Sequence, residues 1–484
     1  MLLQGREKAI PATWAWKKMM RFVVIFISVA GFAALLWPSS DEHNTLLYTP
    51  SNITISKSVK CDPDLETLRR LDVKTLAAYT RREMLVNITD ESLPITHALD
   101  MPLLSMKNTK TSQHVGVEEI SDGCTVPIPV SVQVPQPPKL ADASHIDFGV
   151  ATTISRLNDS LDQFAHWAGY TRTRIFALVE PEKDSGNGVN YLRTKADALG
   201  INLVVTVSDD DYLYRYFALV PLLQQNMRES TRWGCIIDDD TFFISMAALV
   251  DAMDGYDHTK PMYVGGLSEG MPQIAVFGMI AFGGAGVFLS RPLLNEITAV
   301  YNECEQMTYT GDRRLANCIY QYTTTRLTVD HRLRQLDLMK DASGFFESGR
   351  EPPLSVHHWK SWFESNIPKL AVISNLCGDT CLLRRWFFND NWYLTNGFSI
   401  VQYGFENTPA PNDITMEMSW EPHNGATDES YLHELGPLRR KDDGKVSYLL
   451  EDAIVDSDGR VRQWYIKRDS KNGDEIIELL WRKQ

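Results

Sequence analysis

A short apolar strand that runs directly into three carboxylates is the feature that most limits how this chain can fold. Cys235–Ile237 is apolar throughout, and Asp238, Asp239 and Asp240 follow it. An uninterrupted apolar strand of this length is typical of the interior of an α/β sheet, which helices cover on both faces. The aspartates then lie at the carboxyl end of the strand, the edge where open α/β sheets bind ligands.

Three adjacent carboxylates repel one another unless a cation or hydrogen-bond donors compensate their charge. A bound divalent metal is the simplest compensation. In an extended chain Asp238 and Asp240 point the same way, roughly 7 Å apart, and Asp239 points the opposite way. The alternative is a solvated acidic loop without an ion.

Strands alternate with helices around this motif, which predicts a doubly wound, mostly parallel α/β sheet. Thr152 and Thr153 end the first of these strands at the same sheet edge. They either contact a nucleotide there or cap the following helix, which includes Arg156. The expected strands are Ile146–Ala151, Arg174–Val179, Asn202–Val207 and Pro261–Ser268, and the clearest helix is Tyr212–Met227.

Composition narrows the function. The chain has 484 residues with 44% hydrophobic content, enough for more than one domain. Its formal net charge is -14. This acidic balance gives no basic face for nucleic acid, so we expect no nucleic-acid partner.

The N-terminus predicts a single membrane span. Phe22–Trp37 is uncharged and apolar, with Lys17, Lys18 and Arg21 before it. This charge distribution orients the N-terminus toward the cytoplasm. We therefore expect a cytoplasmic tail (residues 1–21), an uncleaved anchor (22–38) and a lumenal stem (39–143) that includes the Pro-rich stretch Pro127–Pro138. A cleaved signal peptide is the competing interpretation.

A lumenal address agrees with two other features. Three Asn-x-Ser/Thr sequons occur, at Asn52, Asn87 and Asn158, and such triplets accept N-glycans. Seven cysteines are present, and an oxidising compartment permits disulfides. Conceivable pairs are Cys61 with Cys124, Cys304 with Cys318, and Cys377 with Cys381, which would leave Cys235 free, although sequence does not determine connectivity.

A glycine cluster follows in Phe282–Pro292. Gly283, Gly284 and Gly286 permit close approach of the backbone to a ligand, although tight strand turns use glycine in the same way.

Several motifs in order resemble the Fringe-like β-1,3-glycosyltransferases, an inverting family that includes β-1,3-galactosyltransferases and core 1 synthase. They are WGCIIDDDTFF, YVGG, FGGAGVFLSRP, Gly311–Cys318 and Val356–Trp359. The resemblance spans roughly His145 to Trp362. It implies a GT-A fold, a nucleotide-sugar donor, usually UDP-linked, Mn²⁺ as the metal, and a Golgi or ER membrane location.

The resemblance also implies roles for individual residues. Asp240 resembles the direct metal ligand, Asp238 lies near the ribose or the metal, and His357 completes the metal site, with His358 as the alternative. Asp312 resembles the catalytic base, since inverting transfer needs a base for the acceptor hydroxyl proton. Without the resemblance, Asp312 would be a helix cap. The expected donor-binding residues are Thr152, Thr153, Arg156, Asp238, Asp239, Gly283 and Gly284.

These observations predict a type II membrane glycosyltransferase that transfers a sugar from a UDP-sugar to a glycan or glycoprotein hydroxyl with inversion, forming a β-1,3 linkage. Its parts are a GT-A-like doubly wound mixed sheet (144–368) and a small antiparallel β extension (369–484). A catalytically inactive sugar-binding or partner-binding relative is the alternative, because Gly311 and Ala316 depart from the family pattern. A two-metal phosphoester hydrolase would need further His and Asp ligands, which the sequence does not offer.

Overall fold

The computed structural model describes residues 53–104, 124–181, 187–363, 365–404, 414–423 and 425–484. None of the helices within these ranges is long and apolar enough to cross a membrane. The expected cytoplasmic tail and the apolar run Phe22–Trp37 lie outside the described residues.

A seven-stranded mixed sheet positions the acidic motif. Its strand order is β12-β10-β11-β8-β5-β6-β7. β8 is parallel to β5, and β5, β6 and β7 continue in parallel, whereas β11 is antiparallel to both of its neighbours. The predicted α/β sheet is confirmed. The bounds are β5 (Ile146–Thr152), β6 (Arg174–Val179), β7 (Asn202–Val207), β8 (Trp233–Ile237), β10 (Tyr263–Gly265), β11 (Val287–Ser290) and β12 (Leu327–Val329).

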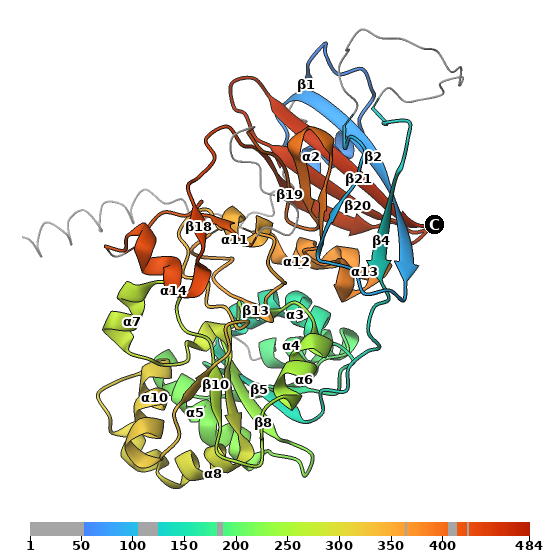
Figure 1. Cartoon of the computed structure of the whole chain (residues 1–484). Coiled ribbons are helices and arrows are strands. Elements are labelled where there is room, and N and C mark those ends of the chain that lie inside the picture. The colour runs from blue at the N-terminus through green and yellow to red at the C-terminus, as the bar shows by residue number, and fades with distance from the viewer. Residues whose placement is uncertain (1–52, 105–123, 182–186, 364, 405–413, 424) are drawn as a thin grey trace, which may run out of the picture. The chain divides into compact units, whose positions relative to one another are not determined.

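Helices cover both faces of this sheet, as Figure 1 shows for the helices around β5, β8 and β10. One face packs against α3 (Ile154–Ala168), α4 (Gly188–Ala198) and α6 (Met246–Asp254) in one hydrophobic cluster. The other packs against α5 (Tyr212–Gln225), α8 (Arg291–Ala299) and α10 (Gly311–Tyr322) in a second cluster. Burial on both faces explains why β8 is uninterruptedly apolar.

A ten-stranded sheet is assembled from the two ends of the described chain. Its order is β1-β2-β21-β20-β19-β16-β15-β14-β3, with β4 paired to β2. The predicted C-terminal meander is present as β19, β20 and β21, which pair in antiparallel fashion. The bounds are β1 (Thr54–Ile55), β2 (Thr75–Thr89), β3 (Thr96–Ala98), β4 (Val130–Pro135), β14 (Arg385–Phe387), β15 (Trp392–Thr395), β16 (Ser399–Gln402), β19 (Val446–Val455), β20 (Val461–Lys467) and β21 (Asp474–Lys483).

This sheet differs from the expected stem and small C-terminal extension. β2 and β4 lie in the stretch assigned to an extended stem, and β2 pairs in parallel with β21 over ten positions. The valines of β4, Val130, Val132 and Val134, alternate with exposed residues and are buried. The pattern of a half-buried strand was therefore present, but its partner is far away in the sequence.

The remaining elements are short. Two small strand pairs are β9 (Phe242–Phe243) with β13 (Ser355–Val356), and β17 (Met416–Glu417) with β18 (Leu438–Arg439). The short helices are α2 (Leu65–Arg70), α7 (Met271–Phe277), α9 (Tyr301–Glu305), α11 (Ser343–Glu347), α12 (Ile367–Leu370), α13 (Ser374–Cys377) and α14 (Leu432–Leu435), and the 3₁₀ turns are η1 (Gly283–Ala285), η2 (Ala371–Ile373), η3 (Asp379–Cys381), η4 (Asn389–Asn391) and η5 (Asp428–Tyr431).

Three disulfides close loops in this structure. They are Cys61–Cys124, Cys304–Cys318 and Cys377–Cys381, and Cys235 of β8 is a buried free cysteine. All three conceivable pairs are thus formed.

Candidate active site

Asp239 points away from its two acidic neighbours and holds the start of α3. Its carboxylate accepts hydrogen bonds from the Thr152 hydroxyl and the Arg156 guanidinium, whose Nε lies 2.6 Å from Oδ2. Its carbonyl oxygen accepts from Ser160 and Gln163, at 2.7 and 2.6 Å. Asp239 therefore connects the end of β8 to the beginning of α3 and fixes the direction of the chain at this point.

Asp238 and Asp240 face a histidine that is remote in sequence but follows β13, the strand paired with β9 just after the acidic motif. His357, directly after β13, places Nε2 2.9 Å from Asp240 Oδ1 and 3.4 Å from Asp238 Oδ2. Asp240 and His357 are buried, whereas the side chain of Asp238 keeps 26% of its exposure. β8 ends at Ile237 and Asp239–Asp240 form a turn, so the chain is not extended here as expected, but both Asp238 and Asp240 face His357.

The electrostatics at His357 favour positive charge. Burial alone lowers its pKa, but the carboxylates of Asp240 and Asp238 outweigh burial and raise the pKa to about 10. In the other direction, burial raises the pKa of Asp240, yet His357 brings it down to about 2. A cation therefore suits this position.

The donor set fits a divalent metal. One ligand atom each from Asp240, His357 and His358 lies within 4.8 Å of the others. The buried Nδ1 of His357 has no hydrogen-bond partner among the described residues. Carboxylate oxygen with imidazole nitrogen suits Mn²⁺ and related divalent ions.

His358 has partners of its own. Its Nε2 lies 3.1 Å from Asp337 Oδ1 and 3.3 Å from Gln335 Nε2, and its ring stacks on Trp362. Only His357 lies between the two aspartates of the motif. The geometry thus favours His357 as the principal imidazole and places His358 directly beside it.

The glycine pair Gly283–Gly284 separates this cluster from Asp312. A Cβ atom at Gly284 would lie 2.1 Å from Cε1 of His357, so only glycine fits. The N–H of Gly283 donates to Asp312 Oδ2 at 3.1 Å, and the Gly284 carbonyl accepts from Thr241 at 2.9 Å. The glycines therefore permit close packing against His357 and Asp312, whereas their predicted contact with a ligand stays a prediction.

Asp312 is a buried carboxylate with a raised pKa, so it accepts a proton more readily than an ordinary aspartate. It lies in the first turn of α10, but Thr310 is the N-cap residue. Burial raises the pKa of the Asp312 carboxyl to about 6, and the negative charges of Asp238 and Asp337 act in the same direction. Gly311 has φ 58°, a conformation that favours glycine, so an acid at this position would be strained.

Two buried acids beside the site were not found from the sequence. Asp337 accepts from Ser268 and from His358, and its own N–H donates to Glu269 at 3.1 Å. Burial raises the pKa of Glu269 to about 8. Glu269 lies four residues after the end of β10 and Asp337 eight residues after the end of β12, but no spacing in the sequence connects the two acids.

The predicted site residues are thus brought together at one sheet edge, although their roles stay predictions. Thr152 contacts Asp239, whereas the Thr153 side chain caps α3 by accepting from the Arg156 N–H at 3.1 Å. The capping interpretation is therefore confirmed for Thr153, whereas nucleotide contact by Thr152 stays a prediction.

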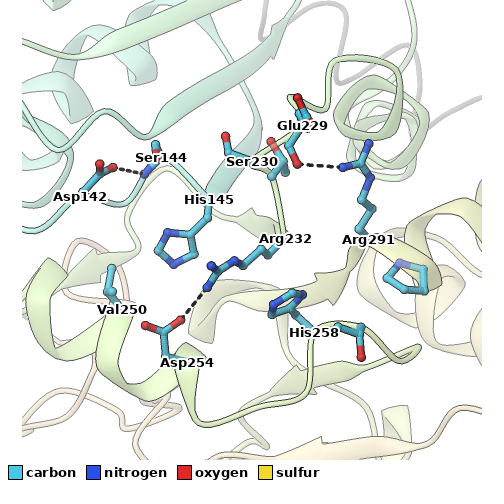
Figure 2. A pocket seen from close by; sticks show the side chains of 13 residues that line it. Asp142, Ser144, His145, Glu229, Ser230, Arg232, Val250, Asp254, His258 and Arg291 are labelled. Carbon is cyan, nitrogen blue, oxygen red and sulfur yellow. Dashed lines mark hydrogen bonds and ion pairs between the residues drawn. The ribbon is translucent and has the colours of Figure 1, made fainter.

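A cavity of about 680 Å³ lies at the opposite edge of the sheet (Figure 2). His145 and Arg232, which precede β5 and β8, line it, and Arg232 pairs with Asp254 at 3.1 Å. It contains none of the predicted site residues.

Residues 218–372 match the model of the Fringe-like family. This region contains the acidic motif, the glycine cluster, Asp312 and His357. The resemblance inferred from the motifs is therefore confirmed over these residues. A search of curated proteins found no significant match.

Solved structures give low similarity. The galactosyltransferase LgtC, in complex with donor and acceptor sugar analogues, is 13% identical with a TM-score of 0.29 over 44% of this chain and 86% of that one. The mannosyltransferase PcManGT from Pyrobaculum calidifontis, with GDP-Man and Mn²⁺, is 11% identical with a TM-score of 0.27, covering 40% and 60%. The glycosyltransferase GlyE of Streptococcus pneumoniae is 12% identical with a TM-score of 0.26, covering 37% of this chain and only 44% of that one. We draw no conclusion from similarity at this level.

Proposed function

Residues 218–372 match the Fringe-like family, and we propose that this protein is an inverting glycosyltransferase. It would transfer a sugar from a UDP-sugar to a hydroxyl of a glycan or glycoprotein and form a β-1,3 linkage. The observation that carries this proposal is the Gly283–Gly284 pair. One glycine donates to the buried carboxylate of Asp312, and the other packs against His357 of the acidic cluster. The residue proposed as the base and the residues proposed to bind the cation therefore both contact this one backbone segment.

Asp312 is the proposed base. As the acceptor oxygen forms its bond to the anomeric carbon, the bond from that carbon to the diphosphate oxygen breaks and leaves its electron pair on the diphosphate. The acceptor hydroxyl proton passes to Asp312, whose raised pKa makes it a better proton acceptor than an ordinary aspartate. The N–H of Gly283 keeps the carboxylate oriented.

Asp240 and His357 are the proposed metal-binding residues, with Asp238 beside them. A divalent cation, when bound, neutralises negative charge on the diphosphate as a Lewis acid. Arg156 and Thr152 hold Asp239 and so set the direction of the chain that carries both ligating aspartates.

Calorimetric titration of the full-length chain in detergent with UDP and GDP, with and without Mn²⁺, tests the proposal. We expect UDP binding that requires Mn²⁺ and that Asp240→Asn weakens by more than roughly tenfold. Asp251→Asn, on the exposed side of α6, is the matched control and should bind normally. Absence of nucleotide binding by the folded wild-type chain would instead support the inactive relative.

A lumenal Golgi or ER location with a single type II span is part of the proposal. The three disulfides support it, because such bonds persist in oxidising compartments. Protease treatment of intact microsomes should leave the catalytic part uncut, and its digestion without detergent would contradict this topology.

A further inference from the structure

Lys360 carries a positive charge beside the acidic cluster without a carboxylate partner. Within the part of the chain that the structure describes, its ammonium forms no ion pair, whereas Arg156 on the same cluster is bound to Asp239. Its charge nevertheless lies within electrostatic reach of Asp239 and Asp240. Because the Lys360 ammonium forms no ion pair with these carboxylates, it is available to bind another anion.

The support of Lys360 is shared with the proposed metal site. Its Nζ lies 4.6 Å from the ring centroid of Trp359, and the Trp359 indole N–H donates to the carbonyl oxygen of Asp240 at 2.7 Å. Trp359 is buried, with 7% of its surface exposed. The lysine ammonium therefore lies over a ring that is hydrogen-bonded to the acidic motif itself.

Lys360 faces open space. It lines a hollow of about 380 Å³ together with Trp359, Phe398 and Leu449–Glu451, the last of these from β19 of the ten-stranded sheet. Glu451 is paired with Arg468 at 3.0 Å, so it does not neutralise the lysine. The hollow gives a ligand access to the ammonium from the side of the second sheet.

We propose that Lys360 binds the diphosphate of the nucleotide donor. It stays in contact with the diphosphate while the bond to the sugar breaks and negative charge accumulates on the leaving diphosphate. The inference rests on the proposed function. A lysine ammonium is a compact point charge, and a positioned cation is most valuable where charge develops. The diphosphate would then be held by both a metal and Lys360, and Trp359 connects the two positions because it contacts the Lys360 ammonium and the Asp240 carbonyl.

The test compares UDP with UMP, because only UDP carries the second phosphate. The full-length chain in detergent with Mn²⁺ is titrated calorimetrically as wild type, Lys360→Met and Lys360→Arg. We expect Lys360→Met to weaken UDP by roughly tenfold or more and UMP by less than about threefold, with Lys360→Arg close to wild type. The control is Lys340→Met, an exposed lysine paired with Glu421 at 2.8 Å, which should change neither affinity.

The other outcomes are distinct. Unchanged UDP affinity in Lys360→Met overturns the inference and leaves the proposed function intact. If Lys360→Met loses affinity for UDP and UMP equally, Lys360 contacts the nucleoside part, and the inference is overturned. If both affinities fall together with the Tm, Lys360 is needed for folding, and the inference is overturned as well. A wild-type chain that binds neither nucleotide contradicts the proposed function itself.

Discussion

Two clusters of buried charge in this protein differ in how completely the protein itself compensates them. At the second sheet, Glu347 and Glu417 flank Lys445, whose Nζ lies 3.0 and 3.2 Å from them. Glu417 also pairs with Arg439 at 3.2 Å, and Glu347 accepts from Ser399 and Tyr403 at 2.8 and 3.1 Å. Each carboxylate there has charged and neutral donors from the protein.

The acidic cluster at β8 is compensated less. Asp239 has Arg156, but Asp238 and Asp240 share one histidine, and Asp312 receives a backbone N–H. The pKa of His357 is raised to about 10, and burial raises the pKa of Asp312 to about 6. The difference teaches that charge left for an external ligand marks a functional site, whereas internally matched charge marks a structural one.

The strongest test of this contrast removes the charge of Asp312. Asp312→Asn should lower kcat by roughly 100- to 10,000-fold, because the amide accepts no proton, while UDP affinity stays near wild type. The folded pKa of Asp312, about 6, lies above the ordinary value of 3.8, so its contribution to stability falls as the pH rises between these values and the full cost is present above pH 6. The free energy of unfolding at pH 7.5, from denaturant titration, should therefore stay equal or rise. Retained turnover would remove Asp312 from the base role.

At the cluster formed by Lys445, Glu347 and Glu417, we expect a loss of stability without a loss of nucleotide binding. Lys445→Met leaves two buried carboxylates without their shared cation and should lower the free energy of unfolding by about 3 to 5 kcal/mol. UDP affinity of the folded fraction should not change. Lys441→Met is the control, because this half-exposed lysine pairs with Asp341 at 3.0 Å and its loss should cost less than about 1 kcal/mol. If Lys445→Met weakens UDP binding without lowering the free energy of unfolding, the proposed difference between the two clusters is wrong.

The smallest expected effect is the pH dependence. Asp312 acts in its ionised form, so kcat/KM should increase through pH 6, by about tenfold per pH unit well below that value, and level off above it. Initial rates in constant ionic strength buffers measure this. A profile that falls between pH 5 and 7 would mean that the protonated acid is the active form.

The seven-stranded sheet and much of the site could be predicted because their signals are local. β6 and β7 occupy the predicted residues, Asn202–Val207 among them, since an apolar run between turns specifies a strand without reference to its partner. The motif resemblance added Asp312 and His357, which no local pattern assigns.

The sequence by itself thus determined the strand that ends in three aspartates, the apolar faces of the helices and a glycine where His357 needs room. Only the tertiary structure decided that Asp239 binds Thr152 and Arg156, that Asp337 and Glu269 are buried beside the site, and that β2 pairs with β21. The physical reason is that side-chain periodicity is encoded residue by residue, whereas strand pairing and charge compensation depend on contacts between segments that are remote along the chain.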